Sequence, residues 1–190
     1  MNYQDLSVAI RYAWSLIGFR YYWTDGSFQS AGNDDPILGF DCSGLVSEIC
    51  RAVGWIGSSE RLSSSDFLAR FPRSKGRKPK PGDILIYGRR LDDGTLDAYH
   101  VSFVISPEHI IEAGGGGRGV DTDGEAAALN AFVRVRPIEF RASEIIACVT
   151  PEGKRNAYLS FWLCCSALSV WVCATANSSF REKRLSQKSI

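Results

Sequence analysis

The sequence predicts an α+β domain, because its pattern of apolar residues changes near residue 81. Before this point, apolar residues recur at helical spacing in two segments, 6–17 and 43–53. After it, short apolar runs alternate with turn residues, which is typical of antiparallel strands. Helices followed by a series of strands indicate an α+β domain. With 190 residues, of which 45% are apolar, the chain can bury one such core plus an appendage, and wholesale disorder is excluded.

Each predicted helix ends at a glycine. Residues 6–17 are followed by Gly18, and residues 43–53 are followed by Gly54. Between the two helices, residues 19–41 mix aromatic side chains with Asp, Gly, Asn and Pro, which predicts an irregular loop.

A polar segment and a basic segment come next. Residues 57–65 are polar, and residues 70–80 contain six Lys and Arg side chains. We interpret the basic segment as a solvated connection, with attraction to an anionic polymer as the alternative. Five strands are then predicted, at 83–87, 100–105, 109–113, 131–136 and 144–149. The domain is therefore expected to end near Pro151, and we assign it to residues 1–152.

The C-terminal extension, residues 153–190, has a different composition. No Asp, Glu, Lys or Arg occurs from Asn156 to Phe180, and the twenty residues 157–176 are predominantly apolar. This length matches a membrane-spanning helix. Four Ser and Thr side chains make the segment only moderately apolar, so an interfacial or packed helix and a dispensable extension are alternatives. The N-terminus lacks the pattern of a cleavable signal peptide.

Charge and cysteine content exclude several classes of protein. With 22 basic and 21 acidic residues the formal charge is +1, so nucleic acid is not an expected partner. Six cysteines are too sparse for a disulfide scaffold, and the absence of a Cys-x-x-Cys pair argues against a zinc site. Cys50 and Cys148 lie on apolar faces of a predicted helix and strand and are expected in the core.

Cys42 carries the sharpest chemical signal. It lies where the irregular loop meets the second predicted helix. The unpaired amides and the dipole of a helix start stabilise a thiolate, and the same amides can stabilise an oxyanion. Asp41 is placed as the N-cap of this helix, and Gly44 leaves room above the sulfur for a substrate backbone. The motif predicts a nucleophilic cysteine, with a small buried residue at a helix start as the alternative.

A nucleophilic cysteine needs a base, and the chain contains only two histidines, His100 and His109. His100 begins a predicted strand that a Ser-Pro-Glu turn connects to the next one. In the register set by a three-residue turn, Ile105 pairs with His109. His100 and Glu112 are then diagonal neighbours on one face, within reach of a hydrogen bond, and His109 falls on the other face. We therefore predict a triad of Cys42, His100 and Glu112, in which the carboxylate orients the imidazole.

Three segments resemble the signature blocks of NlpC-type cell-wall cysteine peptidases. These are Phe40-Asp-Cys-Ser-Gly-Leu-Val46, Pro79-Lys-Pro-Gly-Asp-Ile84 and His100-Val-Ser-Phe-Val-Ile105. The upstream Phe19-Arg-Tyr-Tyr-Trp23 resembles the family's Tyr-x-Trp-Gly-Gly element, although Thr24-Asp25 replaces the paired glycines. Residues 112–117 and 130–137 resemble phage- or prophage-associated members most. The resemblance covers roughly residues 5–151.

This resemblance implies a compact papain-like fold, in which N-terminal helices pack on a small antiparallel sheet. It implies hydrolysis of amide bonds in the peptide stem of peptidoglycan, between D-glutamate and diaminopimelate or lysine, without metal or organic cofactor. Cys42 would be the nucleophile, His100 the base and acid, and Glu112 the orienting residue. Residues implied to contact substrate are Tyr21 near the oxyanion site, and Asp41 and Ser43 along the stem.

Several alternatives remain open at this level. The same triad could pass the acyl group to an amine or lipid, or the domain could be a catalytically silent wall-binding or phage structural module. The run Gly114–Gly117 lacks the Lys-Ser/Thr ending of a phosphate loop and is interpreted as a flexible rim beside the cleft. Because peptidoglycan lies outside the membrane, we expect phage delivery or membrane anchoring through residues 157–176. Oligomeric state is not indicated.

Overall fold

The computed structural model describes residues 3–23, 28–30, 37–74 and 76–151. The C-terminal extension, with its predicted span 157–176, lies outside the described residues, as do Cys164, Cys165 and Cys173. Among the described residues, no helix combines the length and apolar character needed to cross a bilayer.

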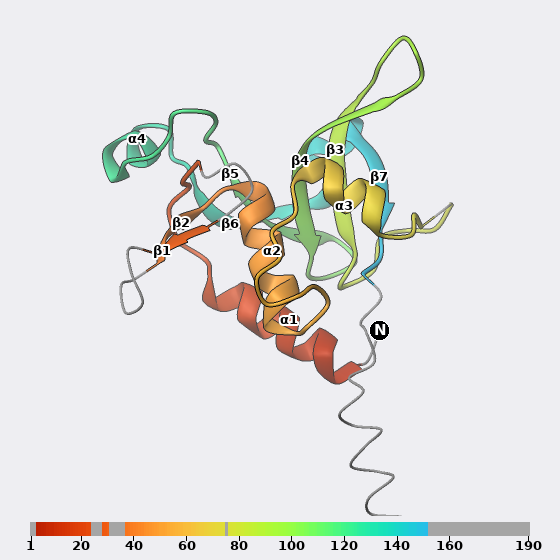
Figure 1. Ribbon diagram of the computed structural model, residues 1–190, viewed down its shortest axis with the longest axis horizontal. Coiled ribbons are helices and arrows are strands. Elements are labelled where there is room, and N and C mark those ends of the chain that lie inside the picture. The colour runs from red at the N-terminus through yellow and green to blue at the C-terminus, as the bar shows by residue number, and fades with distance from the viewer. Residues whose placement is uncertain (1–2, 24–27, 31–36, 75, 152–190) are drawn as a thin grey trace, which may run out of the picture. The chain divides into compact units, whose positions relative to one another are not determined.

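Most of the helical residues lie in the first half of the described chain, and most of the strand residues lie in the second half (Figure 1). In chain order they are α1 (Tyr3–Ser15), β1 (Phe28–Ser30), β2 (Ile37–Phe40), α2 (Cys42–Ala52), α3 (Ser64–Arg70), β3 (Ile84–Arg90), β4 (Leu96–Val104), β5 (His109–Gly114), α4 (Asp123–Ala128), β6 (Phe132–Pro137), the 3-10 helix η1 (Ile138–Glu144) and β7 (Ile145–Val149). The predicted α+β class is thus confirmed, and all five predicted strands are present.

The five later strands form one antiparallel sheet in the order β6-β5-β4-β3-β7. Phe103 lies opposite Ile111 and Val104 opposite Ile110. This is the register predicted from the three-residue turn, because the same alignment places Ile105 against His109, whose carbonyl accepts the Ile105 N–H at 3.0 Å. His109 itself is the first residue of β5, and its Nδ1 lies 3.2 Å from the hydroxyl of Ser106 in the preceding turn.

Both faces of the sheet are buried. The larger core cluster lies between the sheet and the helices and includes Leu45, Phe67 and Phe103. A smaller cluster on the opposite face contains Leu85 and Tyr87, which alternate along β3 with residues of the larger cluster. Because successive strand residues point to opposite faces, this alternation accounts for the nearly continuous apolar run of β3. In Figure 1, α2 and α3 lie in front of the sheet at β4, which both helices contact.

Three segments differ from the sequence predictions. The predicted irregular loop 19–41 contains β1 and β2, which pair as a small antiparallel sheet. The helices α3 and α4 were not expected, because each is too short to show apolar periodicity. Both begin with a capping box, Ser63 with Asp66 and Thr122 with Glu125, which supplies the unpaired amides of a short helix with acceptors.

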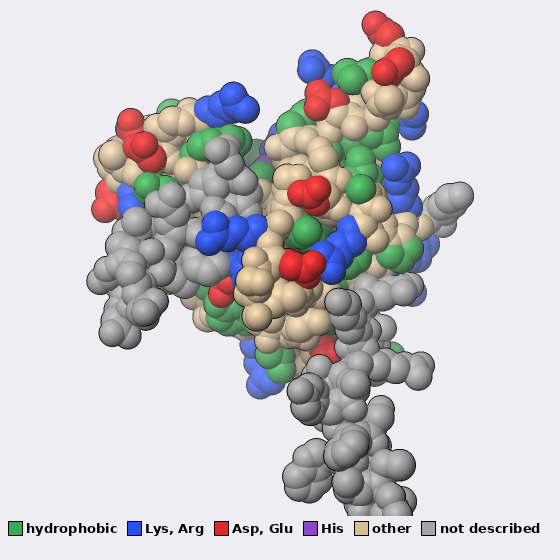
Figure 2. Space-filling view, viewed as in Figure 1, with side chains coloured by type: hydrophobic (Ala, Val, Ile, Leu, Met, Phe, Trp, Pro, Cys, Tyr) green, Lys and Arg blue, Asp and Glu red, His purple; other side chains and the backbone are tan. Residues whose placement is uncertain are grey.

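The basic segment 70–80 is only partly solvated. Arg70 binds Glu60, and Arg77 makes two hydrogen bonds, of 2.7 and 2.8 Å, with the buried carboxylate of Asp83. Figure 2 shows acidic and basic side chains interspersed over the visible face, as expected from the near-zero net charge. Cys50 is buried in the core as predicted, whereas Cys148 is only partly buried, beside the smaller cluster.

Candidate active site

Cys42 is the first residue of α2, and Asp41 is its N-cap, as the sequence predicts. The Gly44 N–H donates to Asp41 Oδ1 at 2.6 Å, and the Ser43 hydroxyl donates to the same oxygen at 3.0 Å. The Leu45 N–H donates to the Asp41 carbonyl at 3.0 Å. The N–H groups of Cys42 and Ser43, which come before Gly44 in the helix, take part in none of these bonds. They are therefore the groups at the helix start that can stabilise an oxyanion.

His100 lies between Cys42 and Glu112. Its Nε2 is 2.7 Å from Glu112 Oε2, within a hydrogen bond, and the Cys42 thiol is also a hydrogen-bond neighbour of the imidazole. Because Nε2 is engaged with the carboxylate, Nδ1 is the nitrogen left for the sulfur. His100 is 7% exposed and Glu112 2% exposed, so the carboxylate is shielded from solvent behind the imidazole.

The charges of this cluster stabilise one another. Burial alone would lower the pKa of His100, but the negative charges of Cys42 and Glu112 outweigh it and raise the pKa to about 9. Burial alone would raise the pKa of Glu112, but the hydrogen bond from His100 and the positive charges of His100, Arg136 and Arg141 hold it below its ordinary value. At neutral pH the arrangement therefore favours an imidazolium beside a carboxylate.

Arg136 supports Glu112 from the side opposite His100. Its Nε lies 2.9 Å from Glu112 Oε1, so the two groups form an ion pair. The Nε–H does not point at this oxygen well enough for a hydrogen bond. The guanidinium also lies 3.8 Å from the centroid of the Phe140 ring. Both Glu112 oxygens thus have a cationic neighbour, one from β4 and one from β6, and the carboxylate has little freedom to turn away from His100.

A β-bulge in β4 presents Tyr99 beside His100. Tyr87 lies opposite His100 while the next residue of β3, Gly88, lies opposite Ala98, so Tyr99 is the extra residue. Tyr99 is 47% exposed and lines pockets on both sides of Cys42. Its hydroxyl donates to Glu144 at 2.5 Å, and Glu144 also binds Arg141.

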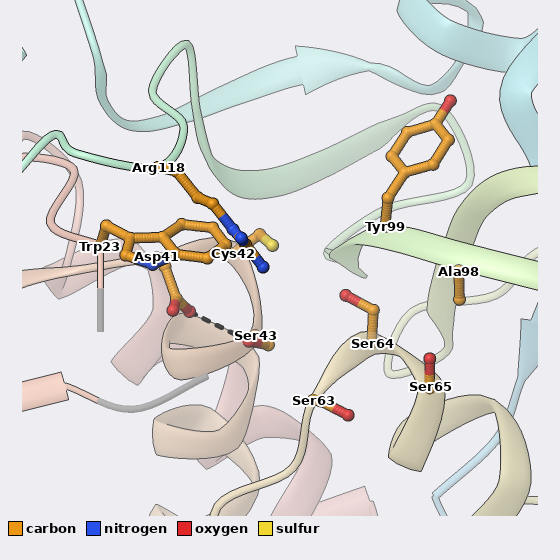
Figure 3. Close-up of a pocket in the computed structure, with 10 residues that line it drawn as sticks. All are labelled: Trp23, Asp41, Cys42, Ser43, Ser63, Ser64, Ser65, Ala98, Tyr99 and Arg118. Atoms are coloured by element: carbon orange, nitrogen blue, oxygen red, sulfur yellow. Dashed lines mark hydrogen bonds between the residues drawn. The ribbon is translucent and has the colours of Figure 1, made fainter. Parts of the chain in front are cut away.

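The two pockets share Cys42, Trp23 and Tyr99, so they are adjacent, and we describe them as two halves of one groove that meet at these residues. The larger half, of about 390 Å³, is also lined by Asp41, Ser43, the serines 63–65, Ala98 and Arg118 (Figure 3). The smaller half, of about 180 Å³, is also lined by Tyr21, His100, Ala113, Gly114–Gly117 and Arg141. This size and lining suit an extended polar ligand.

The run Gly114–Gly117 lines the smaller half of the groove, so it lies beside the cleft, as predicted from the sequence. Gly116 lies flat against the Tyr21 ring, where a Cβ atom would come within 2.1 Å of Cδ1. Tyr21 itself is buried, and burial together with the nearby charges of Cys42 and Asp41 raises the pKa of its hydroxyl above the ordinary value. The hydroxyl therefore stays protonated and able to donate a hydrogen bond.

Gly116→Ala is expected to displace Tyr21 or the loop, because the added methyl group cannot fit against the ring. We expect a loss of about 1–3 kcal/mol in the free energy of unfolding. Chemical denaturation measures this effect. Gly124→Ala in α4 is the matched control, since its Cβ would meet nothing within 4 Å. Equal stability of the two variants would contradict the expected contact.

The structure thus brings together all the residues singled out from the sequence. Their places in the groove are Cys42 in both halves, Asp41 and Ser43 in the larger, Tyr21 and His100 in the smaller, and Glu112 behind His100. Sequence reasoning missed Tyr99, Arg118, Arg136 and Arg141. Of these, Arg136 could have been found from the strand pairing. Arg134 lies opposite Glu112 in the β5–β6 pair, so Arg136 is a diagonal neighbour of Glu112. Among the described residues, no three His, Cys, Asp or Glu side chains gather as metal ligands.

No protein-family model and no curated protein matches the chain, but solved structures do. An NLP/P60-family protein from Staphylococcus aureus, described as similar to lipoprotein, is 17% identical with a TM-score of 0.53, over 80% of this chain and 42% of its own. The peptidoglycan hydrolase RipB from Mycobacterium tuberculosis is 25% identical with a TM-score of 0.52, over 77% of this chain and 64% of its own. RipD from the same organism, described as a non-catalytic NlpC/p60 domain protein adapted to peptidoglycan binding, is 19% identical with a TM-score of 0.52, over 78% and 98%.

Helices packed on one antiparallel sheet, with a cysteine at a helix start facing a histidine on a strand, define the papain-like class of α+β folds. Within that class, the described domain has the NlpC/P60 fold, and the resemblance found in the three sequence blocks is confirmed at this level. The chain spans 42% of the staphylococcal protein and 64% of RipB, so it corresponds to one part of those proteins.

Proposed function

We propose that the protein is a cysteine peptidase that hydrolyses amide bonds in the peptide stems of peptidoglycan. The observation that carries the proposal is the buried chain of contacts from Cys42 at the start of α2 through His100 to Glu112, at the floor of an open groove. The likeness of the fold to RipB, a peptidoglycan hydrolase, supports the choice of substrate.

The mechanism follows from the positions of these groups. The Cys42 thiolate attacks the carbonyl carbon of the stem amide, and the amides at the start of α2 with the Tyr21 hydroxyl stabilise the oxyanion. His100 protonates the departing amine, which leaves a thioester on Cys42. A water molecule that gives its proton to His100 then hydrolyses the thioester and restores the thiolate–imidazolium pair. Asp41 and Ser43 are assigned to the binding of the stem, and no cofactor takes part in these steps.

The bond between D-glutamate and diaminopimelate or lysine is our proposed site of cleavage. Incubation of the protein with purified muropeptides of known stem, followed by mass spectrometry, tests it directly. Products with a new free amine on diaminopimelate or lysine support the proposal. Stems joined to an added amine or lipid would instead indicate acyl transfer. Intact muropeptides that nevertheless bind the protein would indicate a silent module such as RipD.

Activity is expected to fall on the alkaline side with a midpoint near pH 9. The pKa of His100 is raised to about 9, so the imidazole keeps its proton well above its ordinary range and loses it as the pH rises through 9. A neutral imidazole cannot protonate the leaving amine, and kcat/KM should decline with it. A profile of kcat/KM from pH 6 to 10.5 measures the limb. A decline centred near pH 6.5 would show that Cys42 and Glu112 do not act on His100 as described.

Because peptidoglycan lies outside the cytoplasmic membrane, the proposal includes a route to it. Delivery by a phage particle or lysis machinery and anchoring through residues 157–176 are the two routes that the sequence suggests. Fractionation of cells that express the full chain separates them, since an anchored enzyme stays with the membrane.

A further inference from the structure

Arg118 lines the larger half of the groove, and the mechanism above gives it no task. Among the described residues, no carboxylate lies within ion-pair distance of its guanidinium. The arginine of the smaller half differs in this respect, because Arg141 binds Glu144 through contacts of 2.5 and 3.1 Å. The larger half therefore offers a cation whose charge is available to a ligand.

The chain holds Arg118 in a defined place. Residues 117–120 form a turn in which the Val120 N–H donates to the Gly117 carbonyl at 3.2 Å. Gly119 has φ +85°, as the third position of a type II turn requires, so Arg118 occupies the second. The Trp23 N–H donates to the Val120 carbonyl at 2.8 Å, and the Val120 side chain is buried in the core. The turn is thus fastened to the body of the domain.

Trp23 also supports the arginine side chain. The guanidinium carbon of Arg118 lies 5.9 Å from the centroid of the Trp23 ring, a cation–π distance. Figure 3 shows Trp23 and Arg118 on one side of the pocket and Ser63–Ser65 across from them. The other charged residue of this pocket, Asp41, is buried and accepts from Gly44 and Ser43. The carboxylate of Asp41 therefore binds groups at the start of α2.

The position of His100 decides which part of the substrate meets Arg118. His100 must lie beside the departing amine to protonate it, and it lines the smaller half of the groove but not the larger. The amine side of the scissile bond therefore occupies the smaller half. The acyl side occupies the larger half, together with Arg118.

We propose that Arg118 binds a free carboxylate on the acyl-side residue of the substrate, next to the scissile amide. This inference rests on the proposed function and narrows its substrate class to peptides that keep this carboxylate. The planar guanidinium suits bidentate hydrogen bonds to a carboxylate, and such charge-assisted bonds are the stronger kind. Conversion of the carboxylate to a carboxamide removes the charge while the size is unchanged, and it should cost about tenfold or more in kcat/KM.

Two peptides that differ only in this group, carboxylate or carboxamide, test the proposal with the full chain. The wild-type protein is expected to cleave the carboxylate peptide at least about tenfold more efficiently. Arg118→Gln should lose that preference by slowing cleavage of the carboxylate peptide alone, and Arg118→Lys should keep part of it. Arg11→Gln, an exposed arginine on α1, is the matched control and should discriminate as the wild type does. An undiminished preference in Arg118→Gln would overturn the proposal.

A binding measurement separates this proposal from the proposed function. In the Cys42→Ser background, calorimetry with the two uncleaved peptides should show tighter binding of the carboxylate form by about tenfold or more, and Arg118→Gln should abolish the difference. If the wild type cleaves neither peptide, the proposed function fails, and this binding difference still decides the role of Arg118. Equal binding of both peptides to the Cys42→Ser protein would refute it.

Discussion

Cys42→Ala is expected to lower kcat/KM for muropeptide cleavage by about 10⁴-fold or more, because no other group in the groove can form the thioester. The free energy of unfolding should stay within about 1 kcal/mol of the wild-type value, since the substitution removes one atom at a helix start without disturbing the cap. Asp41, which caps α2, keeps its bonds to Gly44 and Ser43 in this variant. Kinetics on purified muropeptide and chemical denaturation measure the two quantities.

Cys50→Ala is the control for this prediction. Cys50 is fully buried in the core, and burial raises the pKa of its thiol to about 12, so it can neither reach substrate nor ionise at neutral pH. Its removal should leave kcat/KM unchanged per folded molecule. Thiol labelling near neutral pH, with the labelled peptides identified by mass spectrometry, adds an independent readout. Rapid labelling of the Cys42 peptide is expected, and a Cys42→Ala protein with wild-type activity would disprove the assignment.

Glu112→Gln is expected to produce the second-largest effect, a fall of about 10²–10⁴-fold in kcat/KM. The neutral amide no longer favours the protonated imidazole, so the alkaline limb of activity should move from about pH 9 toward neutrality. The same change leaves Arg136 without its carboxylate in a largely buried place. The free energy of unfolding should therefore fall by about 2–4 kcal/mol.

Glu108→Gln supplies the matched control, since Glu108 is exposed in the turn of the same hairpin. It should change neither the alkaline limb nor the stability beyond about 0.5 kcal/mol. A pH profile separates orientation of His100 from a purely structural role. If Glu112→Gln lowered stability but kept both the rate and the position of the alkaline limb, Glu112 would be a structural residue only.

The contact between His100 and Glu112 could be predicted because residues close in the chain decide its geometry. His100 and Glu112 lie on consecutive strands joined by a short turn, so the length of the turn and the two-residue repeat of a strand determine which side chains meet. Cys42 is placed by the start of its own helix, a local event that Asp41 caps. These relations need no knowledge of the rest of the chain.

Other parts of the site depend on segments that are distant in the chain. The turn that carries Arg118 reaches the groove only because Val120 is bound to Trp23, almost a hundred residues earlier. Arg141 and Glu144 follow a sheet strand in a 3-10 helix, and Tyr99 meets Glu144 through the order of strands in the sheet. The short strands β1 and β2 likewise form by pairing with each other. Such contacts involve single residues that are far apart in the chain. They therefore leave no periodic pattern in the sequence from which they could be predicted.

The sequence by itself determined the α+β class, the register of the β4–β5 hairpin and the three residues that we assign to catalysis. Those features follow from spacing, capping and turn length, which act over a few residues. Tertiary structure alone decided the two halves of the groove, the packing of Gly116 on Tyr21 and the support of Glu112 by Arg136. These are contacts between elements, and only the packing of the whole domain fixes the distance between residues far apart in the chain.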